Sequence, residues 1–317
     1  MTKSSAPIEL KSNGLASIAI IICTRNRADS LRATLKSISA CRIPNNFSVE
    51  LIVVDNGSSD HTLKVVEQAK DNFSNVTLRC LIEPKPGQAR ARNLAIQNTD
   101  ADLLLWTDDD VLVPVDWVEQ MCKPLLSGCA DAVMGGVRLA ESLKRDWLTP
   151  LMSSWLATTD CYKSERPTLV GANMIFSSKI LEKVSGFCED LGPGALGFRD
   201  DTEFAGRVNL YGFRIVDGRC CEVEHWPGEK RLTRQSLLKS ADSHGRSIAY
   251  DADWIAMRHR ILALPMFCLL YARSWWESLK ASCKYAPVSD KELLMRKNAS
   301  MWREIHRKNW TQISHTP

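Results

Sequence analysis

Apolar residues in the N-terminal part of the chain follow two alternating patterns. Short, nearly continuous runs rich in β-branched residues are typical of strands buried on both faces, and they cover 17–23, 49–55, 76–82 and 101–106. Between these runs, apolar residues recur at helical spacing, over 28–40, 61–70 and 87–99. Strands that alternate with helices predict an α/β fold built on a mostly parallel sheet with flanking helices.

The rest of the chain continues this alternation less regularly and ends in helices. We expect helices over 115–126, 178–186 and 200–212, and strands over 131–139, 169–178, 213–216 and 220–226. Residues 140–168 show no regular pattern, whereas the spacing is helical from Leu232 onwards. These patterns predict a disordered N-terminus at 1–16, an α/β domain at 17–250 and a helical extension at 251–317.

Charge is unevenly distributed along the 317 residues. The formal net charge is +4, but 258–308 alone has eleven Lys and Arg against four Asp and Glu, a surplus of +7. Five of the ten tryptophans also lie between Trp254 and Trp310. Such a segment indicates either a peripheral membrane or partner contact through 258–317, including a homo-oligomer, or a solvated helical face over a small core.

Targeting patterns are not visible in the sequence. The N-terminus is polar, and the longest late apolar run, 261–271, contains Pro265 and is too short to span a bilayer. The eleven cysteines form no CxxC pair, which is typical of reduced, buried thiols. The sequence therefore predicts a cytoplasmic protein, with any membrane contact peripheral and at the inner face of the membrane.

Polar clusters follow the four N-terminal apolar runs, and they begin at Thr24, Asp55, Glu83 and Asp108. Because ligands bind outside the carboxyl ends of parallel strands, we expect these clusters to form one rim. No GxGxxG or GxxxxGK[ST] pattern occurs at any of them. That absence argues against an ordinary dinucleotide-binding fold and a P-loop nucleotidase.

Three consecutive aspartates, Asp108, Asp109 and Asp110, end the fourth apolar run. Residues two apart in an extended segment point the same way, so Asp108 and Asp110 can face one ligand while Asp109 turns elsewhere. A bound Mg²⁺ or Mn²⁺ would offset their repulsion and would complete its shell with substrate phosphates. The alternative is an acidic turn or a helix cap.

Four further positions each have a functional and a structural interpretation. Asp55 can accept hydrogen bonds from a base or ribose, or cap a turn. Arg92 can meet a pyrophosphate at a helix start, or lie on a solvated face. Asp201 can act as a general base, or complement the helix dipole. His225 can join an oxygen-rich metal site or touch a diphosphate, or serve as a structural histidine.

Six segments in order resemble the family 2 glycosyltransferases over roughly 17–250. They are IAIIICTRNRADSLRATLKSI, ELIVVDNGSSDHT, PGQARARNLAI, LLLWTDDDVLVPVDWV, GANMIFSSKILEKVSGF and DDTEFAGRVNLYGFRI. The resemblance implies the GT-A fold, a Rossmann-like sheet with a nucleotide-binding half at 17–113 and an acceptor-binding half at 114–250. Asp200 stands where the family often has Glu, and Phe204 replaces the usual Leu.

The resemblance also implies an activity. It is the inverting transfer of a sugar from a nucleoside-diphosphate sugar, most commonly a UDP-sugar, to a hydroxyl of a glycan or lipid-linked acceptor in polysaccharide or glycolipid assembly. Asp201 would be the general base, and Asp110 would bind Mn²⁺ or Mg²⁺ together with Asp108 and His225. The residues expected along the nucleotide sugar are Thr24, Arg25, Asp55, Arg92, Asp108 and Asp109.

Two other classes of protein share parts of this pattern. A nucleotidyltransferase also uses strand-end carboxylates and a metal, but it should have a glycine-rich basic loop after the first strand, and CTRNRADS has no glycine. A non-catalytic sugar-nucleotide or glycan-binding module should lack the base or the acidic triplet, and both are present. Neither the composition nor a motif indicates a nucleic-acid partner.

Overall fold

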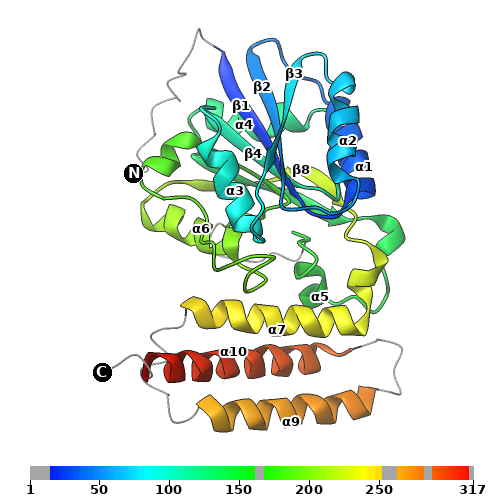
Figure 1. Ribbon diagram of the computed structural model, residues 1–317, viewed down its shortest axis with the longest axis vertical. Helices are drawn as coiled ribbons and strands as arrows, with labels where there is room; N and C mark the ends of the chain where they lie inside the picture. The colour runs from blue at the N-terminus through cyan, green and yellow to red at the C-terminus, as the bar shows by residue number, and fades with distance from the viewer. Residues whose placement is uncertain (1–14, 161–167, 252–262, 282–287, 314–317) are drawn as a thin grey trace. The chain divides into compact units, whose positions relative to one another are not determined.

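The structure is a computed structural model that describes residues 15–160, 168–251, 263–281 and 288–313 (Figure 1). The predicted disorder of 1–16 therefore lies almost wholly outside the described residues. Contacts divide the chain into two units, one made of 1–142, 157–189 and 200–226, the other of 143–156, 190–199 and 227–317. The structure thus groups residues 227–250 with the C-terminal helices, whereas the sequence pattern divided the chain at residue 250.

An eight-stranded sheet in the order β3-β2-β1-β4-β7-β6-β8-β5 forms the centre of the first unit. Its strands are β1 Ala16–Thr24, β2 Phe47–Asp55, β3 Val76–Ile82, β4 Leu103–Asp108, β5 Val111–Leu112, β6 Ala132–Leu139, β7 Asn173–Ser177 and β8 Ile215–His225. Strands β3, β2, β1 and β4 are parallel, and β7 runs antiparallel to both β4 and β6. The predicted α/β class is confirmed, with a parallel first half and a mixed second half.

Helices flank this sheet (Figure 1). Their apolar side chains share one core with those of the strands. They are α1 Ala28–Ser39, α2 Thr62–Ala69, α3 Gln88–Gln97, α4 Trp117–Leu126 and α6 Asp200–Leu210. Helix α3 contacts β1, β2 and β3, and α4 contacts β6, β7 and β8. The run Ile18–Ile22 is at most 1% exposed, which explains why β1 is apolar at successive positions.

Among its described residues, the second unit contains three long helices, α7 Arg234–Asp251, α9 Ala263–Ala281 and α10 Asp290–Ile313, and the short α5 Pro150–Ser154. Helix α10 packs against both α7 and α9 and lies between them in Figure 1. Arg296 of α10 pairs with Asp242 of α7 and places its guanidinium over the Tyr271 ring of α9. Within the described residues, none of the helices is both long enough and apolar enough to cross a membrane.

Three predicted elements differ from the structure. The helix expected over 178–186 is only a 3₁₀ turn at Ser178–Glu182, and Gly186 follows in a left-handed conformation with φ +84°. The two short strands expected at 213–216 and 220–226 form the single strand β8. A bulge opposite Gly135 and Gly136 lets β8 continue through the polar segment that begins at Asp217.

Candidate active site

The parallel strand register brings the predicted polar clusters to one edge of the sheet. Thr24 at the end of β1 pairs with Asp55 at the end of β2, and Cys23 pairs with Asp108 of β4. Strand order reverses here, because β2 and β3 lie on one side of β1 and β4 lies on the other. Open α/β sheets bind ligands at such a switch point.

Asp108, Asp110 and His225 gather at this edge although they come from distant parts of the chain. One ligand atom from each lies within 4.8 Å of the others. Strand β5 causes the approach, because it pairs Val111 with His225 directly after the aspartates. His225 Nε2 then lies 3.2 Å from Asp110 Oδ1. The structure brings together the three residues predicted to bind metal.

The chemistry of this cluster fits a divalent cation. Two carboxylates and an imidazole provide oxygen and nitrogen donors of the kind that suit Mn²⁺, and the carboxylates also suit Mg²⁺. The side chains of Asp110 and His225 are buried, and that of Asp108 is partly open. An accessible Asp108 beside two buried ligands leaves one side of the cluster for substrate oxygens.

Asp109 turns away from the cluster, as the spacing predicted. Its Oδ2 accepts a hydrogen bond from Thr24 Oγ1 at 2.8 Å. Its Oδ1 lies 3.2 Å from Arg27 Nη1, and the same guanidinium nitrogen also pairs with Asp110 Oδ2. Arg27 therefore neutralises two of the three aspartates, and Asp109 has partners within the protein.

Burial and neighbouring charges separate the three aspartates electrostatically. Burial is the main cause that raises the pKa of Asp109 to about 7, against the opposing effect of Arg27. Burial also opposes ionisation of Asp110, but His225 and Arg27 outweigh it and lower its pKa to about 2. The pKa of Asp108 is raised, chiefly by burial. Asp110 is thus the carboxylate most strongly held in the ionised form that a metal needs.

Arg92 is a buried bridge between the acidic triplet and the start of α6. Its Nη1 donates to Asp200 Oδ2 at 2.7 Å, and its Nη2 lies 3.9 Å from Asp108 Oδ1. The guanidinium carbon also lies 5.1 Å from the centre of the Phe187 ring. The alternative of a solvated face is wrong for Arg92, since its side chain is only 4% exposed. Burial raises the pKa of Asp200 to about 6, although Arg92 opposes this shift.

Asp201, the predicted base, lies beside this buried pair at the start of α6 and is only partly buried. Its Oδ2 accepts the Gly171 N–H at 3.0 Å, and its Oδ1 accepts the Thr202 N–H at 2.6 Å. These bonds hold the carboxylate in place. Adjacent aspartates therefore have different surroundings, since Asp200 is buried and paired with a buried cation, whereas Asp201 is partly exposed and bonded to backbone N–H groups.

Two other predicted nucleotide contacts differ in their surroundings. Asp55 is 2% exposed, and its carboxylate accepts the Ser58 N–H at 3.1 Å, as in the turn-capping interpretation. Arg25 is exposed next to the rim. The role of both residues toward a nucleotide stays a prediction.

Three site residues were missed in the sequence interpretation. Arg27 pairs with the acidic triplet, and Gln88 Nε2 donates to Asp108 Oδ1 at 3.3 Å. Asn56 donates to the Lys85 carbonyl at 2.7 Å and accepts the Gly87 N–H at 2.9 Å, so it ties the end of β2 to the start of α3. The sequence signal that could have identified these three residues is their position, because each follows a strand at the edge of the sheet where the polar clusters lie.

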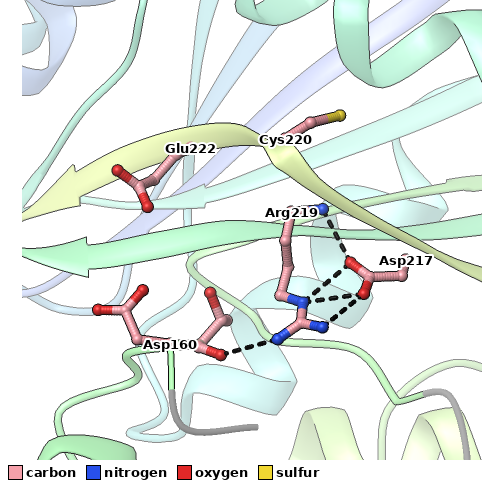
Figure 2. Close-up of a pocket in the computed structure, with 6 residues that line it drawn as sticks. Asp160, Asp217, Arg219, Cys220 and Glu222 are labelled. Atoms are coloured by element: carbon pink, nitrogen blue, oxygen red, sulfur yellow. Dashed lines mark hydrogen bonds and ion pairs between the residues drawn. The ribbon is translucent and has the colours of Figure 1, made fainter.

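A separate hollow of about 400 Å³ lies along the middle of β8 (Figure 2). Figure 2 shows the Arg219 guanidinium against the Asp217 carboxylate of the same strand, with contacts of 2.7–3.0 Å. Glu222, also in the lining, pairs with Arg138. None of the predicted site residues lines this hollow.

The mixed sheet, with an acidic cluster of Asp108, Asp110 and His225 at its switch point, has the architecture of the GT-A type. Comparison with known proteins gives the family. The profile of Glycosyl transferase family 2 matches residues 19–185. The chain is 30% identical over 248 residues to the succinoglycan biosynthesis protein ExoM of Rhizobium meliloti. The matched region covers 74% of this chain and 76% of ExoM. The chain belongs to glycosyltransferase family 2.

Other relatives share smaller parts or the fold alone. The glycosyltransferase AglE of Haloferax volcanii is 29% identical over 121 residues, 38% of this chain and 39% of AglE. The mannosyltransferase PcManGT of Pyrobaculum calidifontis, solved with GDP-Man and Mn²⁺, has a TM-score of 0.60 at 18% identity and covers 93% of this chain and 87% of that one. TarS of S. aureus with UDP-GlcNAc has a TM-score of 0.51 at 15% identity, covering 93% and 92%.

Proposed function

We propose that this glycosyltransferase transfers a sugar, with inversion, from a nucleoside-diphosphate sugar to a hydroxyl of a glycan or lipid-linked acceptor. A UDP-sugar is the proposed donor, and polysaccharide or glycolipid assembly is the proposed process. One observation carries the proposal. Arg92 contacts both Asp108 and Asp200. The cluster of Asp108, Asp110 and His225 and the predicted base Asp201, which follows Asp200, therefore belong to one connected site.

The relatives support parts of this proposal. ExoM is a succinoglycan biosynthesis protein, and PcManGT and TarS were solved with GDP-Man and UDP-GlcNAc, respectively. The Mn²⁺ in the PcManGT complex supports a divalent cation for the similar cluster in this chain. The nucleotide, the sugar and the acceptor are proposals for this protein.

In the proposed reaction, residues at the sheet edge orient the donor. Thr24, Arg25 and Asp55 lie along the nucleotide, and Asp109 supports them through its hydrogen bond with Thr24. Asp108, Asp110 and His225 would hold Mn²⁺ or Mg²⁺, which supplies charge neutralisation for the diphosphate when bound. Arg92 adds a fixed positive charge next to Asp108.

Asp201 then acts on the acceptor. Its carboxylate accepts the proton of the acceptor hydroxyl while the oxygen forms a bond to the anomeric carbon. The bond between that carbon and the diphosphate oxygen breaks, and its electron pair leaves with the nucleoside diphosphate. Attack from the face opposite the leaving group inverts the anomeric centre.

A reducing compartment suits the cysteines of the described residues, all of which are free thiols. We therefore propose a cytoplasmic enzyme that meets its lipid-linked or glycan acceptor at the inner face of the membrane. A homo-oligomer is a further proposal, tested by the mass of the protein in solution.

Release of nucleoside diphosphate from a panel of UDP-, GDP- and dTDP-sugars tests this function. Each reaction contains Mn²⁺, Mg²⁺ or a chelator, with and without a mixture of glycan and lipid-linked acceptors. We expect metal-dependent release with one donor, and loss of release in Asp110→Asn, which keeps the shape of the side chain but removes its charge.

Asp29→Asn is the matched control, because Asp29 is an exposed carboxylate at the start of α1. We expect it to retain full activity. Metal-independent release, or equal release by Asp110→Asn and Asp29→Asn, contradicts the proposed site. A product linkage that retains the anomeric configuration contradicts inversion.

A further inference from the structure

Over the side chains that the structure describes between Pro265 and Trp276, helix α9 is apolar on its partly buried side and also on its exposed side. Arg273, Glu277 and Lys280 are the only charged residues among its 19. The partly buried positions Met266, Phe267 and Leu270 lie together on one side of the helix. A helix that is apolar all round is normally covered on all sides, so the exposed apolar side chains of α9 mark a candidate contact surface.

The exposed side is a continuous aromatic and aliphatic strip, which we call the α9 face. Trp275 and Trp276 are 62% and 58% exposed, and Leu269 and Tyr271 are 47% and 42% exposed. At helical spacing these positions share one broad arc with other exposed residues. The full α9 face consists of Pro265, Cys268, Leu269, Ala272, Arg273, Trp275 and Trp276. Tyr271 lies at its edge, where Arg296 of α10 contacts the ring.

We infer that the α9 face docks on an anionic membrane surface. Tryptophan and tyrosine favour the boundary between headgroups and acyl chains, because their rings are apolar and carry one polar group. Among the side chains that the structure describes on this face, Arg273 is the charged one, and it can reach a lipid phosphate while its stem stays in apolar surroundings. The inference develops the membrane contact proposed above and does not depend on the sugar that is transferred.

Charge favours a membrane over a second copy of the chain. The sequence around α9 carries the +7 surplus of 258–308, with Arg258 and Arg260 before the helix and Lys284 after it. Two copies joined through this face would bring like charges together, whereas anionic lipids attract them. Basic residues that flank an apolar helix face are typical of helices that lie in the membrane interface.

Co-sedimentation with vesicles tests the inference without any donor sugar. The full chain is mixed with vesicles of phosphatidylcholine alone, or of phosphatidylcholine with phosphatidylglycerol. We expect binding to the anionic vesicles that weakens as salt is raised, because added ions screen the charge attraction. Replacement of both tryptophans, Trp275→Ser with Trp276→Ser, should lower the vesicle partition coefficient by about tenfold or more.

A matched control uses another exposed apolar pair, Leu210→Ser with Tyr211→Ser at the end of α6, where the side chains are 82% and 56% exposed. This control should bind vesicles like the unaltered protein. A second variant, Arg273→Glu, keeps the aromatic side chains and should weaken binding to the anionic vesicles alone.

Several outcomes overturn the inference. They are no binding to anionic vesicles, equal binding by the tryptophan variant and the unaltered protein, or no effect of Arg273→Glu. A dimer in solution that the tryptophan variant dissociates, with no vesicle binding, would assign the face to a second copy instead. Failure of the proposed sugar transfer is measured separately by nucleotide release, which these variants leave unchanged when the acceptor is water.

Discussion

Adjacent aspartates at the start of α6 should fail in different ways when each is changed to asparagine. Asn keeps the size of the side chain and removes its charge. Asp201→Asn should remove the proton acceptor while the fold and donor binding persist. Asp200→Asn should instead damage the fold, because it removes the carboxylate that pairs with buried Arg92 at 2.7 Å.

The expected magnitudes follow from the surroundings of each carboxylate. Asn at position 201 retains one carbonyl oxygen for the Gly171 N–H and loses an acceptor for the Thr202 N–H, at a cost of about 1 kcal/mol in stability. Loss of a general base lowers turnover by about 10²- to 10⁴-fold. Removal of one partner from a buried ion pair costs about 3–5 kcal/mol, which applies to Asp200→Asn.

Three measurements separate the variants. Thermal unfolding reports stability, calorimetry reports donor affinity, and nucleotide release with acceptor reports turnover. Asp201→Asn should unfold close to the temperature of the unaltered protein, bind donor normally and turn over slowly. If Asp201→Asn keeps more than about a tenth of the rate, the base assignment is refuted. If Asp200→Asn unfolds at the unaltered temperature, the buried pair contributes less than the geometry indicates.

Three further predictions concern metal access, pH and packing. Arg27→Ala should raise the affinity of the donor-free protein for Mn²⁺ about fivefold, because it removes the cation that pairs with Asp110. Fivefold corresponds to about 1 kcal/mol, as expected for a partly exposed ion pair. Arg25→Ala is the control, and unchanged binding of Arg27→Ala in Mn²⁺ titrations contradicts the prediction. Burial lowers the pKa of His244 from 6.5 to about 3, so between these pH values the unfolded state binds one more proton than the folded state. The free energy of unfolding should therefore fall by up to about 1.4 kcal/mol per pH unit as the pH is lowered through this range. A His244→Phe variant whose melting temperature depends on pH as steeply as that of the unaltered protein contradicts this prediction. Gly171→Ala would place Cβ 2.1 Å from Arg92 Nη2 and should cost about 1–3 kcal/mol, so an unchanged melting temperature refutes this packing.

Local sequence pattern was sufficient for most of the sheet and its helices. The buried runs at β1 and β2 contain apolar residues at successive positions because both faces of the parallel sheet are covered. The resemblance in six ordered segments then identified the family, which the profile match and ExoM confirm. The pair Asp108 and Asp110 could be placed on one side from spacing alone, because side chains alternate in an extended segment.

The tertiary structure decided which distant side chains meet. His225 joins Asp110 only because the two-residue strand β5 pairs with β8, and such a short strand leaves almost no periodic signal. Arg92 becomes a buried link to Asp200 because α3 and the start of α6 meet at the sheet edge, 108 residues apart in sequence. Spacing within one segment determines which side chains share a face, but contacts between segments depend on strand order and packing, which no local pattern encodes.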